Sequence, residues 1–182
     1  MFKKIILSLF ISVLMSSQLT AKSSKTRVID AKKYMIKPFK KAGAIKYGIG
    51  EKPVKGMKKI YYGYDADDNL VAIGSSLILK KTEEVTCVIV LAKDDDAIKI
   101  RQLLIPDLRK KIKSSSYSLK LQDSAKKLRN ITVFENKKKV KIDAITGATK
   151  YSKTFYKSVE SMSDALLKEF KKKHKVELKL FK

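Results

Sequence analysis

The residues that could carry out chemistry lie near the end of the chain, in the stretch DAITGATKYS from Asp143 to Ser152. Its hydroxyl groups can donate hydrogen bonds or be esterified, and Gly147 can adopt backbone angles that other residues avoid. Lys150 and Lys153 add positive charge. We expect a helix to begin at the end of this stretch, and the free N–H groups of a helix start attract anions. The stretch is therefore either an ordinary connection between a strand and a helix or a site that holds a phosphate.

Few other side chains could form a catalytic centre. Cys87 is the only cysteine and lies within an apolar run, so we expect it to be a buried thiol. His174 is the only histidine and lies in a lysine-rich segment. One histidine and one cysteine are too few for the usual zinc sites or for Ser-His-Asp and Cys-His centres. The composition therefore excludes much of hydrolytic catalysis.

The stretch resembles a known signature. Asp143-x-x-Thr146-Gly147-Ala148-Thr149 is similar to the D-x-x-[ST]-G-A-T signature of the FMN-binding domain family. Members of that family occur as exported flavin subunits of sodium-translocating quinone reductases and of Rnf-type electron-transport complexes. In them a flavin transferase uses FAD as donor and joins FMN through its phosphate to the hydroxyl of the final threonine. Outside this stretch the resemblance is one of architecture only.

The resemblance implies a role for each matched residue. Thr149 would carry FMN as a phosphoester, and Thr146, Gly147 and Ala148 would form the tight turn around the phosphate. Asp143 would be the acidic position of the motif that the transferase recognises. The resemblance further implies an electron carrier or redox subunit rather than a stand-alone enzyme. It would relay electrons between a membrane redox partner and an extracytoplasmic acceptor.

Five tyrosines could stack on a flavin: Tyr61, Tyr62, Tyr64, Tyr151 and Tyr156. Tyrosines in strands and at helix starts more often belong to the core or to its rim. We therefore expect these side chains to be mainly structural.

The charge of the chain restricts its partners. The formal net charge is +24, and the lysines are spread in pairs and triplets along the whole sequence. Such an excess predicts attraction to acidic proteins and to an anionic membrane surface. We expect no nucleic-acid partner, because charge alone supplies only non-specific binding and an exported protein meets little nucleic acid.

The N-terminal residues predict export. Lys3 and Lys4 precede an apolar run from Ile5 to Met15, which is too short to span a bilayer, and small residues follow up to Ala21. We expect residues 1–21 to be a signal peptide cleaved after Ala21, with an uncleaved anchor as the alternative. Residues 22–182 then suit a single FMN-binding domain in the periplasm or another extracytoplasmic space.

Four β-prone runs form two successive hairpins in the middle of the chain. The first pair flanks a turn at residues 65–69, and the second pair flanks an acidic turn at residues 94–96. The predicted strands are Ile60 to Tyr64, Leu70 to Leu79, Val85 to Ala92 and Ile98 to Ile105. Successive hairpins predict a curved antiparallel sheet of at least four strands.

Other segments flank these hairpins. Residues 29–41 show helical spacing, and we expect Pro38 to interrupt or end that helix. Residues 43–56 predict a loop with at most a short strand. Pro106 ends the fourth strand, and the serine-rich residues 107–127 suggest a helix, a loop and a second short helix.

The stretch DAITGATKYS lies between a short strand and the last helix. Ile131 to Phe134 and Val140 to Ile142 are β-prone around a turn at residues 135–137, and Ser152 is the predicted N-cap. An apolar stripe then recurs every three or four positions, and we expect it to pack on the sheet rather than on a partner: Phe155, Val159, Met162, Leu166 and Phe170. The predicted fold class is α+β, a curved antiparallel sheet of successive hairpins with flanking helices, the last following the D-x-x-T-G-A-T turn.

Two other functions stay open at this point. The turn could bind a phosphate-bearing ligand reversibly, or none, in a non-enzymatic exported module. Alternatively, the protein could be a basic module that binds membranes or acidic polymers, with DAITGATKYS as a plain connector.

Overall fold

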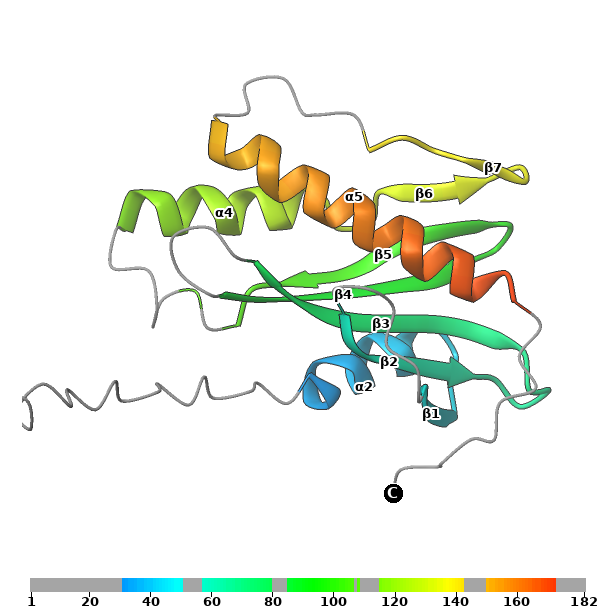
Figure 1. Cartoon of the computed structure of the whole chain (residues 1–182). Coiled ribbons are helices and arrows are strands. Elements are labelled where there is room, and N and C mark those ends of the chain that lie inside the picture. Colours follow the sequence, from blue (N-terminus) through cyan, green and yellow to red (C-terminus); the bar gives the residue numbers. More distant parts are fainter. Residues whose placement is uncertain are drawn as a thin grey trace, which may run out of the picture.

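The computed structural model describes residues 31–50, 57–79, 85–106, 108, 115–142 and 150–172. Within them, one antiparallel sheet of seven strands follows the order of the chain, from β1 at one edge to β7 at the other (Figure 1). The strands are β1 (Lys46–Gly50), β2 (Met57–Tyr64), β3 (Leu70–Leu79), β4 (Val85–Asp94), β5 (Ala97–Leu104), β6 (Thr132–Glu135) and β7 (Lys138–Lys139). The helices are α2 (Lys32–Lys41), α4 (Ser115–Lys127) and α5 (Lys150–Phe170). The prediction of an antiparallel α+β fold with flanking helices is confirmed.

The two predicted hairpins are confirmed, and side chains close both turns. Between β2 and β3, one carboxylate oxygen of Asp65 accepts backbone N–H groups from Asp67 at 3.0 Å and from Asn69 at 2.8 Å. The bond from Asn69 contributes most to lowering the pKa of Asp65. Between β4 and β5, Asp94 accepts hydrogen bonds from Lys99 and Arg101, each at 2.6 Å. Local polar residues therefore fix the register of both hairpins.

Helices cover the two faces of the sheet separately. Figure 1 shows α2 on one face and α4 with α5 on the other. The side chains of a strand alternate between the faces, so Tyr61 packs in the α2 layer while Tyr62 and Tyr64 pack in the α5 layer. Tyr156 is also buried. These four tyrosines are core residues, as predicted, and the side chain of Tyr151 lies outside the described part.

Cys87 is a fully buried thiol on β4, as predicted. Its burial raises the pKa of the thiol to about 12. The thiolate, which is the reactive form of cysteine, is therefore not accessible near neutral pH. Cys87 acts as a small apolar residue of the core.

Two expectations for the flanking segments were wrong. The helix α2 does not break at Pro38 but continues to Lys41, because Pro38 packs on the buried face of the helix. Helical hydrogen bonding continues past it, since the Ala42 N–H donates to the Pro38 carbonyl oxygen at 3.2 Å. Residues 140–142 do not form a strand. Asn136 and Lys137 both have positive φ, so they close a two-residue hairpin in which Lys138 and Lys139 form the strand paired with β6. The Val140 N–H still donates to the Val133 carbonyl oxygen at 3.0 Å, and the strand ends there.

Other predictions were correct in part. The short strand expected within residues 43–56 is β1, which pairs with β2 along one edge of the sheet. The second helix expected within residues 107–127 is α4, whereas the first falls largely outside the described residues. The helix α5 begins at Lys150, two residues before the predicted N-cap Ser152, which lies inside the helix.

A close approach between α2 and the sheet depends on Gly74, in β3. A Cβ atom at this position would lie 2.5 Å from the sulfur of Met35 and 3.1 Å from the carbonyl oxygen of Ile89. Both distances are shorter than ordinary van der Waals contact. The absence of a side chain at Gly74 therefore allows Met35 to pack directly on the strand.

We expect Gly74→Ala to lower the free energy of unfolding by about 1–3 kcal/mol, the usual cost of overpacking a core. Met35→Ala alone should cost about 2–5 kcal/mol through the cavity that it leaves. Because Met35→Ala also opens the space that the new Cβ needs, the double variant should cost at least about 0.5 kcal/mol less than the sum of the single variants. Urea unfolding followed by circular dichroism measures the free energy of unfolding of all three variants. If the costs of the two single variants simply add, the contact with Met35 is not the reason that position 74 requires glycine.

Candidate functional site

The five residues of the predicted site lie outside the described residues. They are Asp143, Thr146, Gly147, Ala148 and Thr149. The structure describes the chain on both sides of them. Ile142 is the last residue described before the turn, and Lys150 is the first residue of α5. Thr149 therefore immediately precedes a helix of 21 residues, which is the sequence context that the prediction requires.

The helix α5 is firmly held by its apolar stripe. Phe155, Val159, Met162 and Leu166 are almost fully buried in the core between α5 and the sheet, and Phe170 packs partly buried against it. The expectation that this stripe packs on the sheet is confirmed. The helix α5 is thereby anchored over β3 and β4.

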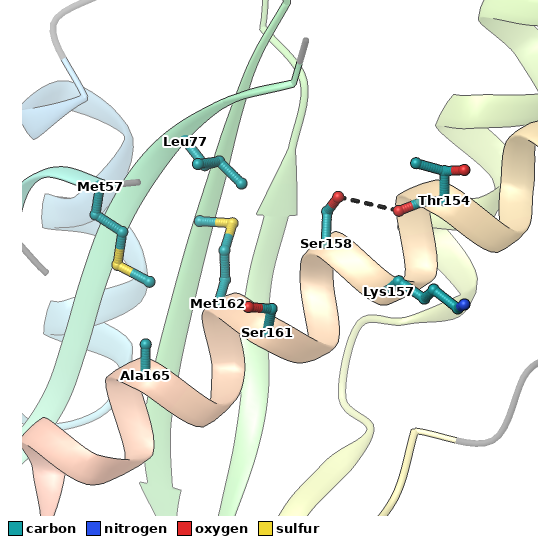
Figure 2. Close-up of a pocket in the computed structure, with 8 residues that line it drawn as sticks. All are labelled: Met57, Leu77, Thr154, Lys157, Ser158, Ser161, Met162 and Ala165. Atoms are coloured by element: carbon teal, nitrogen blue, oxygen red, sulfur yellow. Dashed lines mark hydrogen bonds between the residues drawn. The ribbon is translucent and has the colours of Figure 1, made fainter. Parts of the chain in front are cut away.

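An open pocket of about 370 Å³ lies beside the middle of α5. Met57 and Leu77, which are cross-strand partners at the ends of β2 and β3, form one wall (Figure 2). The other wall is a stripe along α5: Thr154, Lys157, Ser158, Ser161, Met162 and Ala165. The pocket therefore offers apolar surface that includes the thioethers of Met57 and Met162, together with three hydroxyls and one ammonium group from α5.

The pocket follows the axis of α5. Thr154 and Ala165 are eleven residues apart, so the lining stripe extends over about 16 Å at 1.5 Å per residue. The hydroxyl of Ser158 donates a hydrogen bond to the carbonyl oxygen of Thr154 at 3.0 Å, along the helix (Figure 2). The stripe begins only four residues after Lys150. An elongated molecule held at the N-terminal end of α5 could therefore contact the pocket along its length.

A charged cluster on the outer side of α5 has a structural role. Lys139 of β7 donates a hydrogen bond to Asp164 at 2.7 Å and lies 4.0 Å from a carboxylate oxygen of Glu160. The bond to Asp164 contributes most to raising the pKa of Lys139. Lys139 therefore stays charged, and its bond to Asp164 ties β7 to α5. A lysine with a raised pKa lacks the poised protonation state that a general acid or base needs near neutral pH.

The buried phenols near the other end of α5 are also poor acid–base groups. Burial raises the pKa of Tyr62 to about 12, and the negative charge of Glu169 adds to the effect. Burial also raises the pKa of Tyr64. Within the described part of the chain, the Tyr64 hydroxyl has no hydrogen-bond partner. Both phenols stay protonated near neutral pH.

The described residues contain no group of three or more histidine, cysteine, aspartate or glutamate side chains that could hold a metal ion. None of the helices described is both long enough and apolar enough to cross a membrane. Comparison with known proteins gives no match to a family model, to a curated protein or to a solved structure.

The pocket itself was not predicted from the sequence. Its polar wall has a sequence signal, because Thr154, Ser158 and Ser161 recur at helical spacing beside the apolar stripe. The apolar wall has none. Met57 falls at the end of a predicted loop, and Leu77 lies twenty residues further along the chain. Only strand pairing brings these two residues together beside α5.

Proposed function

We propose that this protein is an exported electron carrier in which FMN is joined through its phosphate to the hydroxyl of Thr149. The observation that carries the proposal is the position of the D-x-x-T-G-A-T stretch in the sequence, directly before the first residue of α5, the helix that lines the open pocket. Its partners would be a flavin transferase, a membrane redox protein and an extracytoplasmic acceptor.

The start of α5 suits a phosphate. The first turn contains no acidic residue, so no carboxylate opposes an anion there. The N–H groups of a first helical turn have no partner within the helix and form the positive end of its dipole. Lys150 and Lys153 add formal positive charge in the same turn. A phosphoester on the preceding residue would therefore be stabilised by the helix itself.

The pocket suits the rest of the cofactor. Met57, Leu77 and Met162 offer apolar and polarisable surface to a flat aromatic ring. Thr154, Ser158 and Ser161 offer hydroxyls to a polar chain or to ring carbonyls. Such a division into an apolar wall and a few polar groups is typical of cofactor sites.

The chain would orient the cofactor and set its electrostatic environment. FMN, when bound, supplies the ability to accept and release electrons one or two at a time, which no side chain of this protein offers. The exposed ammonium group of Lys157 would place positive charge beside the pocket, which favours an anion there. The long anchored helix would hold the lining residues in place.

The intact mass of the protein tests the proposal. We would produce the full chain in an exporting host together with an active flavin transferase and measure its mass and its visible spectrum. A mass gain equal to FMN minus water, retained after denaturation and mapped to Thr149, is the expected result. A reversible phosphate binder would instead lose its ligand on denaturation.

An unmodified mass would contradict the proposal if the same transferase modifies a control substrate. The function would then be that of a non-enzymatic exported basic module that binds a phosphate-bearing ligand or an anionic surface.

A further inference from the structure

The helix α2 has a strongly one-sided distribution of charge. Its ten residues, KKYMIKPFKK, include five lysines and no acidic residue. Met35, Pro38 and Phe39 face the sheet and are buried. Four lysines recur along the opposite, exposed side, and we refer to them as the α2 lysine face: Lys33, Lys37, Lys40 and Lys41.

The described residues do not neutralise the α2 lysine face. Among the residues that the structure describes, no carboxylate lies within ion-pair distance of these four lysines. In the acidic turn between β2 and β3, two of the three aspartates are engaged elsewhere. Asp68 pairs with Lys46 at 2.7 Å, and Asp65 is bonded within its own turn. The α2 lysine face therefore remains available for an anionic surface outside the molecule.

Apolar groups border the α2 lysine face. Tyr34 and Ile36 lie on its two flanks and are half-buried, and the ammonium group of Lys33 lies 4.9 Å from the centre of the Tyr34 ring. Ile45, shortly after the helix, is 61% exposed, the largest value among the large apolar residues described. Lysines with an aromatic and an aliphatic border are typical of surfaces that contact lipid headgroups.

The type of basic residue favours a membrane over a protein partner. Protein interfaces are enriched in arginine, which pairs with carboxylates through two parallel bonds, and are depleted in lysine. The α2 lysine face contains no arginine. Clusters of four to eight basic residues on a helix are the usual signature of attraction to anionic phospholipids. A fluid headgroup layer needs no defined pairing geometry, so lysines serve it well.

We propose that the protein docks on anionic phospholipid membranes through the α2 lysine face. The contact is electrostatic, because the apolar side of α2 is already used to cover the sheet. Each lysine held near a charged bilayer contributes about 1 kcal/mol at low to physiological salt. This inference does not depend on the presence of a flavin, and it can be tested on protein that carries none.

Vesicle binding of the full chain tests the proposal. We would measure partition onto vesicles of equal parts phosphatidylglycerol and phosphatidylcholine, and onto vesicles of phosphatidylcholine alone. Replacing Lys33, Lys37 and Lys40 with glutamine should lower the partition onto the anionic vesicles on the order of 100-fold. Replacing the same three lysines with arginine should preserve binding, because the charge is kept.

A matched control lies on the other face of the sheet. Lys120, Lys126 and Lys127 are exposed on α4, so their replacement with glutamine changes the net charge by the same amount. This variant should change the partition by no more than about threefold, since charges more than a Debye length of about 8 Å from the bilayer are largely screened.

Three results would overturn the proposal. Equal losses in the α2 and α4 variants would show that total charge, and not the α2 lysine face, drives binding. Equal binding to phosphatidylcholine alone would show that the contact is not electrostatic. Absence of vesicle binding together with retention on a polyglutamate matrix would indicate an acidic protein as the partner.

Discussion

Replacing Thr149 with alanine is expected to abolish covalent flavin completely. The proposed linkage is an ester between the phosphate of FMN and the threonine hydroxyl, and alanine has no atom that could form it. The variant, produced with an active transferase, should therefore have an unmodified mass and no flavin absorbance after denaturation. Thr149→Ser keeps a hydroxyl and should retain part of the modification.

The control for this prediction is Thr154→Ala. Thr154 is the nearest threonine along α5 and lines the pocket, but the proposal does not place the ester on it. Its variant should keep a full mass gain. The Thr149→Ala variant itself should unfold in urea within about 0.5 kcal/mol of the parent protein. Covalent flavin in Thr149→Ala protein would disprove the assignment of the site.

Replacing Leu166 with alanine is expected to cause a large loss of stability. Leu166 is 0% exposed and belongs to the core between α5 and the sheet. Truncating a fully buried leucine removes apolar burial and leaves a cavity, which together cost about 2–5 kcal/mol. Because the chain has no tryptophan, urea unfolding followed by circular dichroism is the suitable measurement.

Leu119→Ala provides the matched control. Leu119 lies on α4 and is 55% exposed, so the same truncation removes little buried surface. Its free energy of unfolding should change by no more than about 0.5 kcal/mol. Similar costs at the two positions would show that α5 is not held by the buried stripe as the structure indicates. The anchoring argument for the proposed site would then fail as well.

The two proposals concern opposite faces of the sheet. The helix α2 covers one side, whereas α5, which lines the pocket, covers the other (Figure 1). A molecule docked on a membrane through α2 would therefore turn the pocket side away from that membrane. This orientation suits a carrier that passes electrons to an extracytoplasmic acceptor.

Much of the fold follows from local patterns in the sequence. The β-prone runs and polar turns placed β2 to β5 correctly, because strand alternation and turn chemistry are local properties. The apolar stripe of α5 identified its buried face for the same reason. Local patterns failed at Pro38, where packing on the sheet sustains a helix that propensity alone would end.

The sequence by itself determined the candidate attachment residue, because the D-x-x-T-G-A-T stretch is a contiguous signal that needs no fold to be recognised. Tertiary structure alone decided which residues line the pocket beside α5. The pocket joins Met57 and Leu77 to α5, and these segments meet only through strand pairing and helix packing. Tertiary structure also decided that α2 covers the opposite face with its lysines outward, since a helical pattern does not specify which side of a sheet it will cover.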